Sequence, residues 1–240
     1  MDISVPSSTF GVGRGAWWCT FIGFALLLAW DAAGADLQLA RLAAPGGDFD
    51  LREQWLLAGP LHAGVRQLAW ALALWLLAGL WWPTGVLRRI PRSARLQWLA
   101  GMLLGLLLVS AFKHVSQSSC PWDLIEFGGV ASYTGHWGWP AGDGGPGHCF
   151  PAGHASAGFA FVGGYFALRR YAPRHAQACL WASLAAGLML GLVQQVRGAH
   201  FMSHTLWTAW ICWAASIAAQ AVAHLAARPA AGIRAAHDAA

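Results

Sequence analysis

The stretch LQWLAGMLLGLLLVSAFKHV, residues 96–115, decides the fold of this chain of 240 residues. Apart from Lys113, the only lysine in the sequence, it contains no Asp, Glu, Lys or Arg. The hydrocarbon core of a bilayer is about 30 Å thick, and a helix needs about 20 apolar residues to cross it. The stretch therefore predicts a transmembrane helix that ends with a lysine ammonium at one membrane surface.

The whole chain has the composition of a membrane protein. Hydrophobic residues make up 57% and charged residues 10%, against about 25% charged in soluble domains. The 16 tryptophans fit, because Trp gathers where hydrocarbon meets headgroups. We find no internal repeat, so residues 1–240 are expected to form one all-α membrane domain. Six transmembrane helices are predicted, at Ala16–Ala35, Val65–Val86, Leu96–Val115, Ala152–Leu168, Gln177–Val196 and Thr205–Ala226.

The basic residues predict the orientation. Under six spans the larger group falls on one side: Arg14, Arg88, Arg89, Arg92, Arg95, Arg169, Arg170, Arg174, Arg228 and Arg234. The positive-inside rule places that side, with both termini, in the cytoplasm. The other loops then face outward, into the periplasm if the membrane is the inner (cytoplasmic) membrane of a Gram-negative bacterium. The net charge of +5 follows from this topology, so the expected partner is the lipid bilayer and not a nucleic acid.

Two of the outward segments carry further structural predictions, one for an interfacial helix and one for a disulfide. Asp36 to His62 is too polar to cross a membrane, and its mixture of acidic and large apolar residues favours an interfacial helix on the outer leaflet. The loop at 116–150 contains Cys120 and Cys149, which an oxidising periplasm would allow to pair as a disulfide. Two free thiols are the alternative.

Polar residues suited to phosphate chemistry stand at the outward ends of the predicted spans. Lys113 ends the third span, and Pro151-Ala152-Gly153-His154 opens the fourth. A glycine near a helix start lets the backbone approach a ligand, and the free N–H groups there bind anions. His154 would stand beside a phosphate held in this way.

The last polar segment follows the fifth predicted span. Arg197 offers a planar fork that matches phosphate oxygens. His200 and His204 are four residues apart, hence on one face if the sixth helix begins there. Each feature also has an ordinary explanation. Lys113 alone is typical of an interface anchor, Arg197 of a lipid-headgroup contact, and paired histidines also ligate metals or haem.

The first two polar segments resemble motifs of one family. In the type 2 phosphatidic acid phosphatase superfamily, the first motif is a lysine, six residues, then Arg-Pro. Here Lys113 is followed by six residues and Cys120-Pro121. The second family motif is Pro-Ser-Gly-His, and this chain has Pro151-Ala152-Gly153-His154. Alanine thus replaces the serine, and a cysteine replaces the first arginine.

The third family motif is Ser-Arg, five residues, His, three residues, Asp. Val193 and Gln194 hold the Ser-Arg places, His200 the nucleophile's place and His204 that of the aspartate. Arg197 lies three residues after Gln194, about 60° away on a helix, and is expected to replace the lost cation. The outward-loop acids Asp123, Glu126 and Asp143 are candidates for the lost carboxylate. The resemblance covers residues 113–208.

The resemblance implies a mechanism that needs no metal or other cofactor. His200 attacks phosphorus and forms a phosphohistidine, while His154 protonates the leaving oxygen and then activates water. His204 orients the nucleophile. The phosphate oxygens are held by Lys113, Arg197, Ala152, Gly153 and Gln194.

The resemblance implies a lipid phosphate or diphosphate phosphatase acting at the periplasmic membrane face. Undecaprenyl diphosphate, phosphatidylglycerol phosphate, phosphatidic acid and lipid A phosphates are the candidate substrates. Three alternatives stay open: a phosphotransferase using the same site, a haem- or metal-binding membrane protein, and a catalytically dead lipid-binding relative. The choice of lipid and the oligomeric state are also open.

Overall fold

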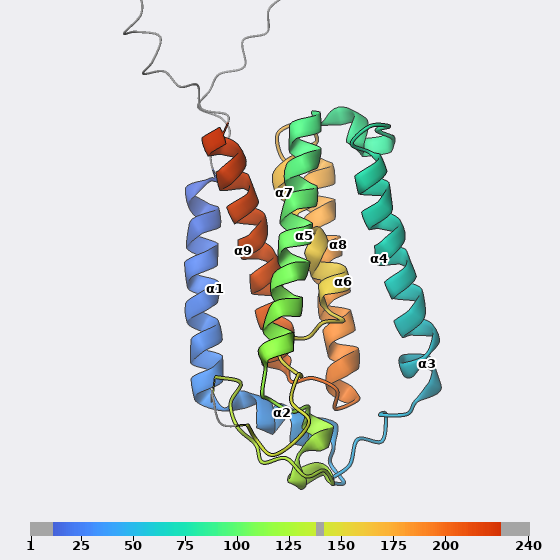
Figure 1. The fold of residues 1–240 in the computed structure, drawn as a ribbon, viewed down its shortest axis with the longest axis vertical. Coiled ribbons are helices and arrows are strands. Elements are labelled where there is room, and N and C mark those ends of the chain that lie inside the picture. Colours follow the sequence, from blue (N-terminus) through green and yellow to red (C-terminus); the bar gives the residue numbers. More distant parts are fainter. Residues whose placement is uncertain (1–11, 138–141, 227–240) are drawn as a thin grey trace, which may run out of the picture.

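The computed structural model describes residues 12–137 and 142–226, and this part of the chain is a bundle of helices (Figure 1). Its α-helices are α1 (Arg14–Ala33), α2 (Ala35–Ala43), α3 (Trp55–Ala58), α4 (Pro60–Ala78), α5 (Arg92–Val115), α6 (Ser156–Phe159), α7 (Gly163–Leu168), α8 (Pro173–Val196) and α9 (Met202–Ala226). Short 3-10 turns lie at Gly85–Arg89 (η2), Pro121–Asp123 (η3), Ile125–Phe127 (η4) and Ala160–Val162 (η5).

Within the described residues, four helices are long and apolar enough to cross a membrane, judged by length and composition: α1, α5, α8 and α9. They match the first, third, fifth and sixth predicted spans. Six spans are not confirmed, because the other two predictions fall on shorter apolar helices, at Gly64–Ala78 and Ser156–Leu168. The all-helical fold is therefore as predicted, whereas the number of full-length spans is not.

The second predicted span, Val65–Val86, has the wrong boundaries. The helix begins at Pro60 and ends at Ala78, well before Val86. Pro83 lacks the N–H that a helix needs, and Gly85 has a positive φ of 51°, which ends regular structure between Ala78 and η2. The carbonyl of Gly79 accepts a hydrogen bond from Arg95 Nη1 (2.8 Å), which fastens this turn to α5.

The fourth predicted span also begins later than expected. Residues 152–155 are not helical, and α6, η5 and α7 follow one another as a short apolar rod inside the bundle. Glycine lets this rod approach α8 closely: a Cβ on Gly158 would lie 2.3 Å from the backbone nitrogen of Gly187. Small residues of this kind permit tight helix packing in membranes.

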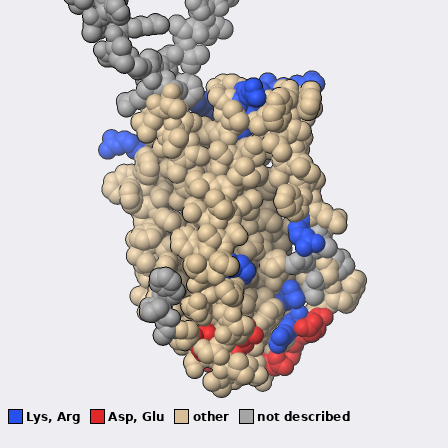
Figure 2. All heavy atoms as spheres, in the orientation of Figure 1, with Lys and Arg blue, Asp and Glu red and all other residues tan. Residues whose placement is uncertain are grey.

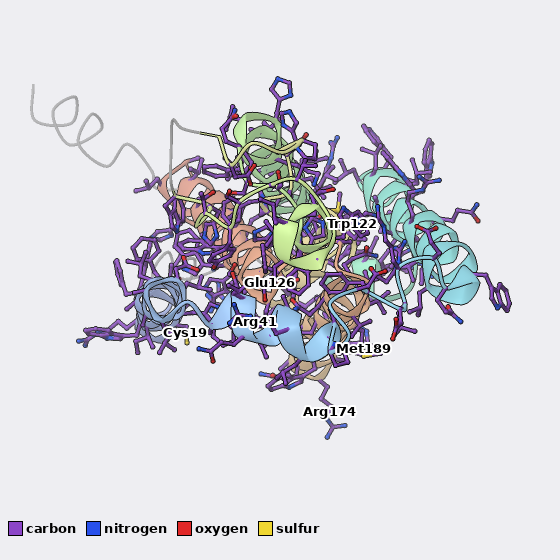
Figure 3. All side chains as sticks on the ribbon, turned by 90° about the horizontal axis from the view of Figure 1, so that it is seen from below. Cys19, Arg41, Trp122, Glu126, Arg174 and Met189 are labelled. Carbon is purple, nitrogen blue, oxygen red and sulfur yellow. A yellow bond between two sulfur atoms is a disulfide. The ribbon has the colours of Figure 1, made fainter. Side chains whose placement is uncertain are left out.

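The site end of the bundle is the end at which α2 and the loop at 116–155 lie (Figures 1 and 3). The predicted interfacial segment, Asp36 to His62, is not one helix, since 44–54 is not helical and the segment holds α2, α3 and the start of α4. Phe49 from this segment is buried against Phe127 of the loop, because both belong to an apolar cluster that closes this end. Arg41 of α2 binds Glu126 of η4 across it (Nε–Oε1 2.5 Å; Figure 3).

Charges are distributed unequally between the two ends (Figure 2). The end opposite the site end, where α5 and α8 begin, carries basic side chains, and Figure 2 shows the acidic ones gathered at the site end. Arg88, Arg89, Arg92, Arg169, Arg170 and Arg174 lie in or beside the turns of the basic end.

Candidate active site

A cavity of about 410 Å³ lies between α4, α5, α6 with η5, and α8. Its walls are mostly apolar and include Trp70, Met102, Leu106, Phe161 and Leu190. Five polar side chains also line it: Arg66, Lys113, His154, Ser156 and Gln194. Among the described residues that line it there is no carboxylate. The cavity thus combines an apolar chamber with positive charge, an arrangement suited to a lipid with an anionic headgroup.

Two predicted phosphate-binding residues meet on the wall of this cavity. Lys113 lies in the last turn of α5, and Gly153 precedes α6. A Cβ on Gly153 would lie 3.8 Å from Cδ of Lys113, so the lysine side chain packs directly against the glycine backbone. The Lys113 side chain therefore lies beside the backbone of the second motif.

The three predicted catalytic histidines are neighbours. The ring centroids of His154 and His200 are 6.3 Å apart, and the Nδ1 atoms of His200 and His204 are 3.5 Å apart. His154 lines the cavity, whereas His200 and His204 are buried and are not among the lining residues, with 3% and 1% of their surfaces exposed. The expected helical face does not explain this contact, because α9 begins at Met202, after His200.

The pKa of His200 is lowered well below its ordinary value. Burial of the imidazole is the largest cause, and the charges of Lys113 and His154 lower the pKa further. A neutral imidazole keeps a lone pair available for attack on phosphorus. His204 Nδ1 lies 3.1 Å from the carbonyl oxygen of Cys149, an acceptor that orients the second ring.

Ala152 does not contribute to the cavity in the way that was predicted. It is fully buried, and its N–H donates to the carbonyl of His204 (3.1 Å). Its own carbonyl accepts from Thr208 Oγ1 (3.1 Å). Because both backbone groups are engaged by α9, Ala152 fixes the second motif to the helix that carries His204, and its N–H is not free for a phosphate.

Gln194 and Arg197, both predicted to bind phosphate, occupy different positions relative to the cavity. Gln194 lines the cavity, but Arg197 is not among the lining residues. Arg197 donates from Nη1 to Gln194 Oε1 (3.3 Å) and from Nε to the carbonyl of Arg52 (3.1 Å). Since its oxygen is occupied, Gln194 retains its amide NH₂ as the group able to donate to a ligand. Arg197 thus contacts the cavity residue Gln194 and does not itself line the cavity.

Cys120 and Cys149 form a disulfide, with an S–S distance of 2.08 Å and Cα atoms 5.2 Å apart. The bond ties the end of the first motif to the start of the second. Sγ of Cys149 lies 3.5 Å from Nδ1 of His200, so the bridge also packs against the predicted nucleophile.

We expect the disulfide to be present in the protein purified from an oxidising compartment. It closes a loop with a sequence separation of 29, which stabilises the fold by roughly 3 to 4 kcal/mol in the chain-entropy view. Alkylation of unfolded, unreduced protein should modify only Cys19, Cys179 and Cys212. Five modified cysteines without reductant would contradict the bridge, and the Cys120→Ser/Cys149→Ser double variant provides the control mass.

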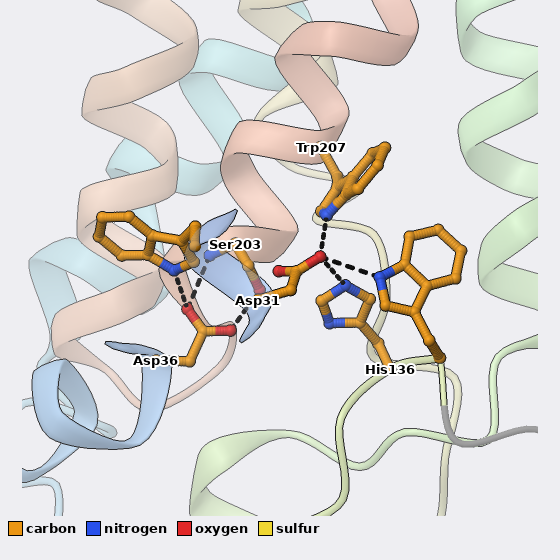
Figure 4. A network of polar contacts seen from close by, with 7 residues as sticks. Asp31, Asp36, His136, Ser203 and Trp207 are labelled. Carbon is orange, nitrogen blue, oxygen red and sulfur yellow. Dashed lines mark hydrogen bonds and ion pairs between the residues drawn. The ribbon is translucent and has the colours of Figure 1, made fainter. Parts of the chain in front are cut away.

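A carboxylate from α2 holds the first turn of α9 (Figure 4). Asp36 Oδ1 accepts from the backbone N–H of Ser203 (2.9 Å) and from Trp30 Nε1 (2.9 Å), and Oδ2 accepts from the Ser203 hydroxyl. The first N–H groups of a helix have no partner within the helix, so Asp36 caps α9 from another segment. Ser203, the residue that Asp36 binds, lies between His200 and His204 in sequence, so the cap helps to position both histidines.

Asp36→Ala is expected to destabilise the protein and to lower its activity. The change leaves a buried N–H without its acceptor, at a cost of about 1–3 kcal/mol, and releases the turn that carries the histidines. Thermal unfolding in detergent and the rate of phosphate release would both be measured. Asp50→Ala, an exposed acidic residue of the same segment, is the matched control. Equal behaviour of the two variants would refute the capping role.

A second carboxylate network lies beside this cap (Figure 4). Asp31 Oδ2 accepts from Trp137 Nε1 and Trp207 Nε1, both at 2.9 Å, and lies 3.1 Å from His136 Nε2. The His136 ring meets His204 edge-on, with centroids 5.6 Å apart. Asp31 thus joins α1 to the loop and to α9 one turn after His204.

The loop acids considered for the lost carboxylate are engaged elsewhere. Asp143 binds the backbone N–H and the hydroxyl of Ser119, and Asp123 accepts from the N–H of Cys120. Glu126 pairs with Arg41. None of these contacts involves His200 or His204, and the nearest acceptor to His204 in the hydrogen-bond pattern is the Cys149 carbonyl.

Two groups in the described part of the chain bring three potential metal ligands within 4.8 Å of one another. In the group of Cys120, Cys149 and His200 both sulfurs belong to the disulfide. In the other, Asp31, Asp36 and His136 lie on the wall of a second cavity of about 320 Å³, where their side chains already bind protein groups.

Three polar residues near the cavity or the histidines are outside the motifs: Asp31, Arg66 and His136. Two of them carry a visible signal in the sequence. Asp31 and Arg66 are, with Lys113, the only Asp, Glu, Lys or Arg residues within the six predicted spans. A charged residue inside a membrane segment marks a functional site more often than chance. His136 carries no comparable signal, because it lies in an irregular loop.

The comparisons with known proteins agree with the motif pattern. The sequence profile of the PAP2 superfamily matches residues 94–227, more than half of the chain and all three motifs. No match to a curated protein or to a solved structure accompanies it. Members of this superfamily are generally phosphatases. The chain therefore belongs to the PAP2 superfamily, the type 2 phosphatidic acid phosphatases.

Proposed function

We propose that the protein is a membrane phosphatase that removes a phosphate from a lipid phosphate or diphosphate through a phosphohistidine on His200. One observation carries the proposal: a single cavity joins apolar walls to Lys113, His154 and Gln194, and His200 lies against His154. The walls suit an acyl or prenyl chain, and the polar residues suit its phosphate.

Each step uses a group already described. The His200 imidazole attacks phosphorus, and the bond to the lipid oxygen breaks while His154 donates a proton to that oxygen. His154 then accepts a proton from water, and the resulting hydroxide releases inorganic phosphate and restores His200. Lys113, the Gln194 amide and the backbone at Gly153 stabilise the negative charge that develops on the phosphate oxygens. Arg197 contributes by holding the Gln194 amide.

The proposed orientation places the site end in the periplasm and both termini in the cytoplasm. Support comes from the arginines at the opposite end, which the positive-inside rule assigns to the cytoplasm. The disulfide adds support, because such bonds persist in the periplasm and are rare in the cytoplasm. The inner membrane of a Gram-negative bacterium fits both features.

Trapping the covalent intermediate tests the mechanism. Rapid acid-free quenching with a lipid labelled in its terminal phosphate should leave the label on the peptide containing His200, stable to base and lost in acid. A chase with unlabelled lipid alcohol then separates hydrolysis from phosphotransfer, since transfer would yield labelled lipid in place of free phosphate. Turnover without a label on His200 would rule out the phosphohistidine route.

The pH dependence provides a further prediction. His200 acts as a neutral imidazole. Because its pKa is lowered, it stays neutral when the pH falls below about 6.5, the ordinary pKa of a histidine. In Lys113→Met one of the lowering charges is absent, so the acid limb of kcat/KM should move to higher pH. The ionisation of the lipid is the same for both proteins, so a shift between them belongs to the enzyme. An identical limb in both would disprove this electrostatic coupling.

A further inference from the structure

Arg66 is a cation on the wall of the proposed lipid cavity that the mechanism above does not use. It belongs to the second turn of α4, and Ala69, Trp70 and Ala73 line the same cavity. Positions three, four and seven residues apart share one face of a helix. That face, with Arg66 at the end nearer the start of α4, is therefore the one directed at the cavity.

The charge of Arg66 is not compensated by the described part of the protein. The side chain is exposed, and it makes no hydrogen bond or ion pair with the described residues. The residues lining the cavity include Lys113 as a second cation and, among those described, no carboxylate. Charged residues in apolar segments of membrane proteins commonly mark the path of a ligand, and an anionic ligand would neutralise this cation.

Arg66 and Lys113 occupy different places relative to the nucleophile. Lys113 packs against Gly153 of the second motif, whereas Arg66 lies on α4 in line with Ala69 and Trp70. The two cations come from different helices, α5 and α4, around one cavity. The cavity therefore has a cation beside the second motif and another on a different helix, which provides positive charge for a second anionic group.

We propose that Arg66 determines substrate specificity by binding a second anionic group of the lipid, distinct from the phosphate that His200 attacks. A guanidinium presents paired N–H donors that match two oxygens of a phosphate. The favoured substrates then carry two such groups, either as a diphosphate or as a phosphomonoester beside a phosphodiester. This inference rests on the proposed phosphatase function and names the recognition element within the same site.

The test compares lipids matched in their chains. One pair is a polyprenyl diphosphate and the polyprenyl monophosphate, and the other is phosphatidylglycerol phosphate and phosphatidic acid. Arg66→Gln should raise KM about 10- to 100-fold for the two-anion member that serves as substrate, with kcat little changed and the one-anion member little affected. Arg66→Lys should be intermediate. Gln67→Ala, at the neighbouring position outside the cavity lining, should match the wild type.

Which pair responds identifies the source of the second anion. Equal effects of Arg66→Gln on both members of each pair, or no effect, would overturn the inference. Binding of the same four lipids, followed by quenching of Trp fluorescence, separates this result from a failure of the proposed function. The wild type could release no phosphate and still bind two-anion lipids more tightly than one-anion lipids. If Arg66→Gln then lost that binding preference, the role of Arg66 would be supported and the proposed phosphatase function would be contradicted. An unchanged preference in Arg66→Gln would overturn the role of Arg66 whatever the activity.

Discussion

Replacement of His200 by alanine is expected to abolish phosphate release, and replacement of His154 to lower it by about 10²- to 10⁴-fold. Without His200 no phosphohistidine can form, and without His154 the lipid oxygen leaves unprotonated. The ring centroids lie 6.3 Å apart, which is why the proposed mechanism assigns both residues to one reaction centre. Phosphate release under saturating lipid, normalised to folded protein, measures the loss.

A matched control separates chemistry from folding. His175→Ala changes an exposed histidine near the start of α8, at the opposite end of the bundle, and should retain the wild-type rate. His200 is buried, so its variant must also show a wild-type elution profile and thermal unfolding. If a folded His200→Ala protein kept near-wild-type turnover, the proposed nucleophile would be wrong.

Loss of the ammonium of Lys113 is expected to have the second-largest effect. Removing one preorganised charge that stabilises a transition state typically lowers kcat about 10²- to 10³-fold, so Lys113→Met should fall in this range. Lys113→Arg, which keeps the charge but changes its shape, should recover part of the rate. A near-wild-type rate for Lys113→Met would show that the phosphate lies elsewhere.

Lys113 also offers a chemical measurement, because it is the only lysine in the chain. An amine-acylating reagent can modify only this side chain and the N-terminal amine. Orthovanadate, which resembles the pentavalent transition state of phosphoryl transfer, should protect Lys113 and leave the N-terminus reactive. Equal labelling with and without vanadate would contradict a position beside the phosphate.

The sequence was sufficient for the features that depend on local composition. The apolar run before Lys113 predicted the end of α5 at Val115, although the helix begins four residues earlier than predicted, at Arg92. The motifs also singled out His154, His200 and His204, whose side chains are neighbours in the structure. Lys113 and Gly153 meet because the first two motifs are linked by the disulfide and line one cavity. These contacts lie between residues of the motifs that can be identified in the sequence.

The features that the sequence misassigned depend on contacts between distant segments. The predicted helix start at Ala152 failed because α9 takes the backbone groups of that residue. Arg197 was expected at the phosphate because helical periodicity places it on nearly the same face as Gln194. In the structure its guanidinium donates to the carbonyl of Arg52 and to the side-chain oxygen of Gln194. The cap from Asp36 joins residues 167 positions apart, a distance at which no local pattern is informative.

The most direct test of the central claim is phosphate release by the purified protein from four lipids in the presence of EDTA. The lipids are undecaprenyl diphosphate, phosphatidylglycerol phosphate, phosphatidic acid and a lipid A phosphate, each in mixed micelles. The account predicts that at least one of them yields inorganic phosphate, that EDTA does not prevent it, and that His200→Ala eliminates it. Folded wild-type protein that releases no phosphate from any of the four, or that is as active with His200→Ala, would contradict the assignment of this site as a lipid phosphatase.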